Sequence, residues 1–384
     1  MGTHQEGSVL KYEGCNFFRQ RLILATVSGR TVKVSKIRSK DEEPGLREFE
    51  ASFIRLLDEI TNGSITSISR SGTTFQYTPG LLVGGSLTHE CNPERSISYY
   101  LEPLLCLAPF TKHPLDITLT GVTNSQTDPS VDQIRYSSLP ILKKFLGTDE
   151  GLELKILQRG AAPEGGGLVK FTCPCRQKLR PVQFLEPKKI KRIRGIAWSV
   201  RVSPTTPNRM VEAAKGILTT FVADIFITAD SRKGKGSGKS PGFGITLVAE
   251  TLSGAFLTAE ACSNPKGSTD PPSVPEDIGK QAATLLLEEI YRGGCVDSTS
   301  QSLAALCMVL GPQDVSKILT GPLSPYTIQF LRHIRDFLQV MFKVDAAHQE
   351  GVGPDGEKLR QGGEDRVVLT CLGMGYSNIS KRTA

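Results

Sequence analysis

The stretch SRKGKGSGKSPGFG, residues 231–244, contains Gly-Ser-Gly-Lys-Ser, the residue types from which phosphate-binding loops are built. A Walker A loop needs Gly-x-x-x-x-Gly-Lys-Ser/Thr between a strand and a helix, because backbone N–H groups and the helix N-terminus hold the phosphates. Five residues before Gly238 stands Lys233 instead of glycine, and a strand-like run follows Ser240. Spacing and context therefore exclude a Walker A loop.

The same stretch is predicted to be a flexible hairpin loop between two strands. Its positive charges could still contact RNA phosphates without holding a nucleotide. They lie on Arg232, Lys233, Lys235 and Lys239.

The nine cysteines are a second set of residues that could do chemistry. The closest pair, Cys173 and Cys175, has one residue between the thiols, whereas zinc sites space paired ligands by about two to four. Several cysteines lie in apolar runs, such as Cys106 in PLLCLAP and Cys307 in AALCMVL. Their odd number and scattered spacing indicate reduced core cysteines, and no metal site is expected.

A third set lies in the sequence RHIR, where Arg332, His333 and Arg335 fall close together on a predicted helix. Guanidinium groups can orient a scissile phosphate, and a histidine can act as general acid or base. In the structural alternative, Arg332 pairs with Asp336, Arg335 is solvated and His333 flanks the buried side. Paired acidic residues of the metal-nuclease type are missing nearby, so these residues are RNA- or partner-binding candidates without an assigned catalytic role.

Positive charge is concentrated in one segment of the chain, whose formal net charge is +7. The segment from Lys170 to Arg201 contains ten Lys and Arg residues and one acidic residue, Glu186, which is an excess of nine positive charges. The remainder of the chain is therefore slightly acidic. Such a segment is typical of polyanion binders, because phosphate contacts release counterions. A solvated face and a nuclear-import signal in KKIKRIR are the alternatives. The candidate RNA- or partner-binding residues are Lys188, Lys189, Lys191, Arg192 and Arg194.

The composition, 39% hydrophobic and 22% charged over 384 residues, is that of a globular protein with room for two or three domains. No stretch approaches the roughly 18 apolar residues of a membrane span, and the start MGTHQEGS lacks a signal-peptide core. Glu6 stands where a myristoylation signal needs Ser or Thr. We therefore expect a cytosolic or nuclear protein without membrane contact.

Short β-type runs alternate with amphipathic helices, which predicts an α/β or α+β fold. Helices are expected at 44–63, 275–294 and 324–342. In the last, Ser324 is the expected N-cap, and the expected buried stripe is Ile328, Leu331, Ile334, Leu338 and Met341. Strands are expected at 64–71, 74–80, 115–121, 167–173, 196–202, 221–230, 243–251 and 366–375. A polar tract at 347–365 is expected to form a mobile excursion.

Several separated stretches resemble the RNA 3'-terminal phosphate cyclase family, and more closely its cyclase-like branch. They follow the family's order nearly end to end: EGCNFFRQRL (13–22), SGRTVKVSKIRSKDEEPGLREFE (28–50), SGTTFQYTPGLLVGG (71–85), LDITLTGVTN (115–124), APEGGGLVKF (162–171), LSPYTIQFLRHIRDFL (323–338) and GMGYSN (373–378). The resemblance implies three pseudo-repeated units, each two helices on a four-stranded sheet, with a smaller inserted α/β domain. It places the large domain at 1–186 and 278–384 and the inserted domain at 187–277.

True cyclases of this family have an EGGGQ start and a C-terminal histidine that attacks ATP to form an adenylated enzyme. In this chain the start reads EGCNFFRQ, with bulky Phe17 where the backbone must approach a ligand. No histidine lies at 320–329, and Ser324 or Tyr326 stands at the nucleophile's place. These departures predict that ATP use and cyclisation are lost, so neither a catalytic residue nor a cofactor is expected.

The cyclase-like branch implies a nucleolar protein of small-ribosomal-subunit assembly. Its members join the pre-ribosomal particle that contains the U3 small nucleolar RNA, bind a ribosome-assembly GTPase and are needed for early pre-rRNA cleavages. We therefore expect a non-enzymatic scaffold for the GTPase and pre-rRNA in the nucleus and nucleolus. The alternatives are a pre-rRNA endonuclease that uses the degenerate site near Arg332, His333 and Arg335, and an active cyclase.

Overall fold

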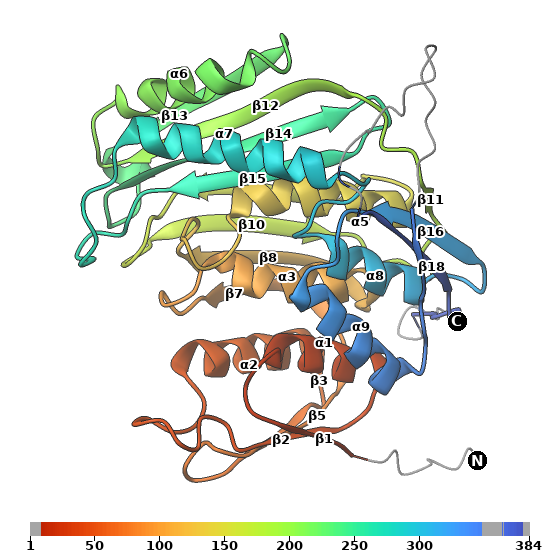
Figure 1. The fold of residues 1–384 in the computed structure, drawn as a ribbon. Helices are drawn as coiled ribbons and strands as arrows, with labels where there is room; N and C mark the ends of the chain where they lie inside the picture. The colour runs from red at the N-terminus through yellow and green to blue at the C-terminus, as the bar shows by residue number, and fades with distance from the viewer. Residues whose placement is uncertain (1–8, 348–362, 364, 379–384) are drawn as a thin grey trace, which may run out of the picture.

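The structure is a computed structural model that describes residues 9–347, 363 and 365–378. Over these residues the chain forms four four-stranded mixed sheets with helices packed against them (Figure 1), which confirms the expected α/β class. Within the described ranges, no helix has the length and apolar character to cross a membrane. The predicted excursion at 347–365 lies, apart from residues 347, 363 and 365, outside the described residues.

Three of the sheets have the same topology. The first two strands along the chain are parallel, and the fourth strand pairs antiparallel with the second and the third. In spatial order, the first sheet consists of β1 (Leu10–Glu13), β2 (Val32–Ser35), β5 (Phe75–Thr78) and β4 (Ile65–Ile68). The second sheet consists of β7 (Gly84–Glu90), β8 (His113–Gly121), β10 (Gly167–Cys173) and β9 (Glu153–Gln158). The third sheet consists of β11 (Gln183–Phe184), β16 (Val315–Thr320), β18 (Val367–Leu372) and β17 (Lys343–Ala346).

Each of these sheets has two main helices, as the three pseudo-repeated units require. They are α1 (Phe18–Ser28) and α2 (Glu48–Ile60); α3 (Ile97–Leu107) and α5 (Leu139–Leu146); and α8 (Gln301–Val309) and α9 (Pro325–Leu338). Shorter elements are the β3 (Thr61–Asn62) and β6 (Leu81–Leu82) pair, α4 (Val131–Gln133), and single turns at Ala108–Phe110, Ile134–Ser138 and Gly234–Gly236.

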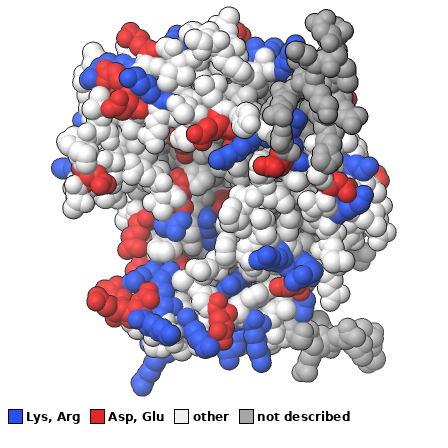
Figure 2. Space-filling view, in the orientation of Figure 1, with Lys and Arg blue, Asp and Glu red and all other residues white. Residues whose placement is uncertain are grey.

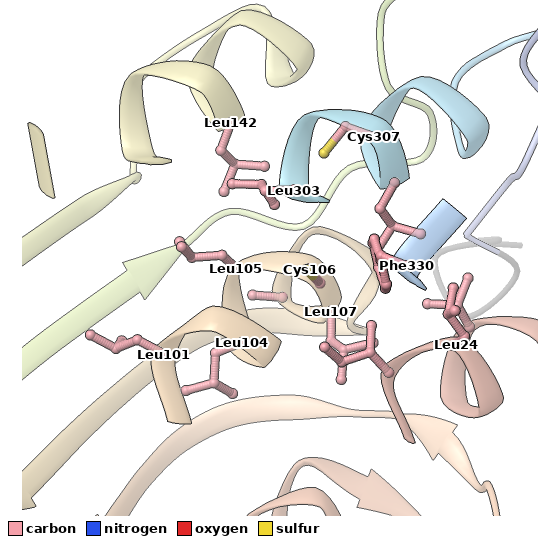
Figure 3. Packing of buried hydrophobic residues seen from close by; sticks show 14 of the residues in the cluster. Leu24, Leu101, Leu104, Leu105, Cys106, Leu107, Leu142, Leu303, Cys307 and Phe330 are labelled. Carbon is pink, nitrogen blue, oxygen red and sulfur yellow. The ribbon is translucent and has the colours of Figure 1, made fainter. Parts of the chain in front are cut away.

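The three units share one hydrophobic core, in which α3 is central. Figure 3 shows Leu101, Leu104 and Leu105 of α3 near Leu142 of α5 in the same unit and near Leu24 of α1, Leu303 of α8 and Phe330 of α9 from the other two units. Cys106 and Cys307 also lie in this cluster, and all nine cysteines are free thiols. Because each sheet buries one face against helices that its neighbours also contact, the units form one body.

The fourth sheet has a different strand order, β13 (Ile225–Arg232), β12 (Ile190–Val200), β14 (Gly242–Thr251) and β15 (Phe256–Cys262). With α6 (Thr206–Leu218) and α7 (Pro275–Arg292) it has its own core, which includes Met210, Leu247 and Leu286. The expected inserted domain, 187–277, ends near the start of α7, whereas Ile278 and Leu286 of α7 pack in this second core. We propose that α7 belongs to the inserted unit; the division into domains stays a prediction.

The start of α9 is as expected, and its buried face is so in part. The Ser324 hydroxyl caps the helix by accepting a hydrogen bond from the Thr327 N–H at 3.1 Å. Of the expected stripe, Ile334 is buried, Leu331 and Leu338 pack against the core, and Ile328 and Met341 are exposed. The buried face also includes Phe330, His333 and Phe337, because α9 packs on α1 through its aromatic and histidine side chains.

The glycine-rich stretch 231–244 is not the flexible hairpin loop that the sequence suggested. It joins β13 and β14, which lie on opposite sides of β12. Its backbone is bonded to the loop after β9: the Gly238 N–H donates to the Arg159 carbonyl at 2.6 Å, and the Lys239 N–H donates to the Gly165 carbonyl at 2.9 Å. A Cβ atom at Gly238 would lie 2.2 Å from the Gly165 oxygen, so close backbone packing explains this glycine.

Replacing Gly238 by alanine should therefore loosen the contact between the inserted unit and the second unit. We expect Gly238→Ala to lower the free energy of unfolding by about 1–3 kcal/mol, the usual cost of overpacking a tight site. Gly236→Ala is the matched control, because a Cβ atom there meets nothing within 4 Å. Urea unfolding followed by the fluorescence of Trp198, the single tryptophan, measures both. Equal unfolding midpoints for the two variants would contradict the close backbone packing at Gly238.

Candidate functional site

The degenerate N-terminal motif and α9 meet at Gln20, which lies in the first turn of α1. The Gln20 side-chain N–H donates to the Tyr326 carbonyl at 3.0 Å, so its oxygen is left to accept a hydrogen bond. That oxygen lies 3.0 Å from Nδ1 of His333, and Nε2 of His333 lies 3.1 Å from the amide nitrogen of Gln329. This arrangement matches a neutral imidazole that donates from Nδ1 and accepts at Nε2.

His333 is fully buried, and its ring packs edge-on against Tyr12 and Phe17. Burial lowers the pKa of His333 to about 4, and the positive charge of Arg21 acts in the same direction. A neutral imidazole with both nitrogens hydrogen-bonded has no free lone pair for nucleophilic attack. His333 is therefore a structural residue that joins α1 to α9.

The residues at the expected place of the cyclase nucleophile are also bonded within the protein. The Ser324 hydroxyl caps α9 and lies 2.9 Å from the Thr327 hydroxyl. The Tyr326 hydroxyl donates to Glu102 at 2.8 Å, and burial raises its pKa well above the ordinary value. Over the described residues, no histidine or carboxylate is hydrogen-bonded to the Ser324 hydroxyl, so nothing there activates it for attack.

A cavity of about 290 Å³ opens beside Ser324 and Tyr326. Two arginines line it, and their guanidinium groups lie 4.1 Å and 4.4 Å from the centre of the Tyr99 ring. Both are neutralised within the protein, Arg19 by Glu102 at 2.7 Å and Arg95 by Asp128. An anion entering this cavity would compete with carboxylates that already hold the cations, so the site is poorly suited to nucleotide phosphates.

The predicted cluster of Arg332, His333 and Arg335 is split between two sides of α9. The two arginines are exposed, whereas His333 faces the core. The ion pair suggested between Arg332 and Asp336 does not form: Arg332 donates to Gln329 at 3.3 Å, and Asp336 accepts from the Tyr12 hydroxyl at 3.2 Å. The histidine is therefore not available as an acid or base beside the arginines.

Most candidates in the basic segment are paired with acids. Arg192 lies 2.6 Å from Glu250, and Lys191 lies 3.9 Å from the same residue. Arg194 contacts Asp224 at 2.8 Å, and Lys188 lies 3.6 Å from Glu186. Within the described part of the chain, Lys189 has no ion pair. The net charge of this surface is thus smaller than the local sequence count of nine.

A larger cavity of about 500 Å³ lies between the inserted sheet and the second unit, and sequence reasoning did not find it. Trp198 and Glu260 line it from the inserted sheet. The Glu260 carboxylate accepts hydrogen bonds from the Ser130 N–H at 2.6 Å and from the Thr246 hydroxyl at 3.1 Å. Burial raises the pKa of Glu260 to about 7. The bond to Ser130 ties the two units together at the cavity wall.

A second tie between these units is the buried guanidinium of Arg159. It contacts Asp132 of the second unit at 2.5 Å and Asp230 of β13 at 2.8 Å. The three residues are far apart in sequence, so no local pattern could have indicated this network.

The structure also forms a Ser–His–Glu chain that the sequence did not suggest. The Ser52 hydroxyl lies 3.1 Å from Nε2 of His89, and Nδ1 of His89 lies 3.1 Å from Glu59. These contacts have the order of a hydrolase triad. However, Ser52 is only 1% exposed and His89 4%, so a substrate cannot reach the hydroxyl. This chain connects α2 to β7.

Among the described residues, no three His, Cys, Asp or Glu side chains form a group that could hold a metal ion. The arrangement therefore offers a packed, neutralised remnant of a site, two exposed arginines on α9 and a polar cavity beside the inserted sheet.

Comparisons with known proteins agree with the resemblance seen in the sequence. A family model described as RNA 3'-terminal phosphate cyclase matches residues 10–344. The RNA 3'-terminal phosphate cyclase-like protein of Homo sapiens is 60% identical over 97% of this chain and 97% of its own length. The probable protein of that name in Drosophila melanogaster is 53% identical over 98% of each chain. The rRNA processing protein rcl1 of Schizosaccharomyces pombe is 42% identical over 98% of this chain and 99% of its own length.

The buried state of His333 predicts a loss of stability in acid. The unfolded chain takes up this proton below about pH 6.5, whereas the folded chain takes it up only near pH 4. Acidification from pH 7 to pH 4 should therefore favour unfolding, by up to about 3 kcal/mol from this residue.

His333→Gln keeps a hydrogen-bonding side chain but removes the titration. Urea unfolding of both proteins at pH 7 and pH 4.5 should show a smaller acid loss in the variant. The same acid loss in both, or an NMR titration of His333 near pH 6.5, would show that the imidazole is not held neutral.

Proposed function

The chain belongs to the RNA 3'-terminal phosphate cyclase family, and on this premise we propose that it is a ribosome-biogenesis factor that acts in pre-rRNA processing without cyclase activity. The observation that carries the proposal is the buried, neutral His333 beside the hydrogen-bonded Ser324 and Tyr326. The family's covalent chemistry needs an accessible nucleophile, and these side chains offer none. The printed name of the fission yeast relative, an rRNA processing protein, supports the process proposed.

The finer proposal is that the chain acts in small-subunit assembly, in early cleavages within the particle that contains the U3 small nucleolar RNA. It would be a scaffold in the nucleus and nucleolus for a ribosome-assembly GTPase and pre-rRNA. The docked glycine-rich loop and the neutralised arginines support a chain that holds no nucleotide of its own, so that GTP stays with the partner.

Two surfaces are proposed as contacts for RNA or the GTPase. One is the segment that contains Lys188, Lys189, Lys191, Arg192 and Arg194, and the other is the exposed side of α9 with Arg332 and Arg335. The competing proposal, a pre-rRNA endonuclease, also needs the arginines of α9, since guanidinium groups can hold a scissile phosphate. The burial of His333 away from them favours the scaffold, because this histidine cannot then act as an acid or base beside them.

Two assays on the purified chain separate these functions. Incubation with labelled ATP should leave no covalent adenylate, with an active cyclase of the family as positive control. Incubation with a short pre-rRNA transcript should give no discrete cut. An adenylated chain would refute the loss of cyclase chemistry, and a cut abolished by Arg332→Ala or Arg335→Ala would establish the endonuclease instead. In cells depleted of the endogenous protein, the chain should restore early pre-rRNA cleavage.

Charge reversal tests the basic segment. Lys188→Glu, Lys189→Glu and Lys191→Glu together should reduce recovery of pre-rRNA or the GTPase from nuclear extract, or reduce nuclear accumulation. Arg209→Glu is a control outside the segment, because Arg209 is exposed and already paired with Glu276 at 2.6 Å. If recovery of both partners and nuclear accumulation are all unchanged in the triple variant, the segment is only a solvated face.

A further inference from the structure

One face of the first sheet is left open. Helices α1 and α2 lie on the other side of this sheet (Figure 1), where Val32 and Val34 of β2 are fully buried. Lys33 lies between these two valines, and side chains alternate between the two faces of a strand, so Lys33 projects from the open face. Lys11 of β1 is paired in register with Lys33, and both are exposed.

The two lysines begin a row that crosses the whole sheet. Lys33 is in register with Gln76 of β5, and Gln76 with Ser67 of β4. We call Lys11, Lys33, Gln76 and Ser67 the lysine row. All four side chains can donate hydrogen bonds to an anionic oxygen. Strands about 4.8 Å apart make the row about 14 Å long, so more than one phosphate of an extended strand can lie along it.

The equivalent sheets show what is special about this row. In the second sheet Lys155 and Lys170 are also in register, but each has an acid beside it, Glu153 at 2.7 Å and Asp116 at 3.1 Å. In the third sheet Lys343 pairs with Asp345 at 3.0 Å. The lysines of the second and third sheets lie on the third and fourth strands along the chain and have acids beside them, whereas Lys11 and Lys33 lie on the first two strands of their sheet.

In the first sheet the neighbouring acid is already occupied. Glu13, two residues after Lys11 on the same face, lies 2.8 Å from Lys36. Over the part of the chain that the structure describes, neither Lys11 nor Lys33 has an ion pair. Like charges directly opposite each other on neighbouring strands repel. A bound polyanion would remove this repulsion, so the row is arranged to gain from phosphate.

The surface around the row carries charges of both signs. Figure 2 shows Lys and Arg side chains over the lowest part of the molecule, where the first unit lies, with a group of Asp and Glu side chains at its left. Lys40 and Arg70 of this unit are exposed, and so are Asp41, Glu42 and Glu43. Affinity for a polyanion therefore has to come from the contacts of the row itself.

We propose that the lysine row is a binding site for the phosphate backbone of single-stranded RNA. The inference rests on the proposed role in pre-rRNA processing and adds where RNA is held. A protein partner fits less well, because protein interfaces need apolar or aromatic anchors at their centre. The exposed apolar side chain Ile65 stands on β4, at the opposite edge of the sheet from Lys11.

Binding of a short labelled single-stranded RNA to the full chain, titrated with salt, tests the site. Lys11→Glu with Lys33→Glu should weaken binding at least about tenfold and reduce the slope of log K against log salt by about 1.4, since each lost phosphate contact removes about 0.7. Lys11→Arg with Lys33→Arg should bind as the unmodified chain does, because the charge remains.

The matched control is Lys155→Glu with Lys170→Glu, which makes the same change in net charge on the equivalent face of the second sheet. It should leave RNA binding unchanged. An equal loss in both charge-reversed pairs overturns the proposal, because binding would then follow net charge alone. Unchanged affinity and slope in the Lys11 and Lys33 pair overturns it as well. The proposal is also overturned if the chain binds polyglutamate through the lysine row but does not bind RNA, because the partner would then be an acidic protein.

The same variants separate this inference from the proposed function. If the unmodified chain restores pre-rRNA cleavage in depleted cells and the Lys11→Glu, Lys33→Glu pair binds RNA normally, the lysine row is refuted while the function stands. If the unmodified chain fails to restore cleavage, the proposed function is refuted whatever the RNA affinity of the row.

Discussion

The shared burial of three sheets around α3 is the constraint on which the rest of the structure depends. A four-stranded sheet with two helices buries only one of its faces, and a unit of this size has little core of its own. In this chain the helices of all three units bury their apolar sides in one cluster that runs from Phe18 to Cys371. The helices are therefore held between units. Packing of this kind brings α1 and α9, far apart in sequence, into contact at Gln20 and His333.

That contact is part of a network that joins the first motif to α9. The hydrogen bonds of Gln20, Gln329 and His333 hold the first motif against α9, and the carboxylates of Glu102 and Asp128 hold the arginines beside Tyr99. These polar groups are satisfied by other parts of the chain. A buried polar group left without a partner would cost about 1–3 kcal/mol, so this network stabilises the fold. A catalytic site would instead need some of these polar groups free to bind a ligand.

The sequence predicted the elements better than their partners. Helices α2, α7 and α9 follow from local patterns, as the Ser324 cap of α9 illustrates, whereas α1, α3, α6 and α8 are not among the helices expected from them. The exposure of Ile328 was not predicted, because only the contact with α1 decides which apolar side chains of α9 are buried. Charge counts failed for a related reason: acids that neutralise the basic segment, Glu250 of β14 and Asp224 just before β13, lie outside the segment in sequence. The Arg159 network and the larger cavity arise only when the inserted sheet docks on the second unit.

The place of the inserted sheet also has a consequence for the order of folding. Strand β11 pairs with β16 through Gln183 and Lys317, and the whole inserted unit and α8 are synthesised between them. Closing so long a segment carries an entropic cost that grows with the logarithm of its length, and contacts between distant parts of a sequence slow folding. The inserted unit has a separate hydrophobic core, so it can fold first and bring its two ends together. The third sheet would then be the last to form, and folding of the whole molecule would be complete only when β16 pairs with β11.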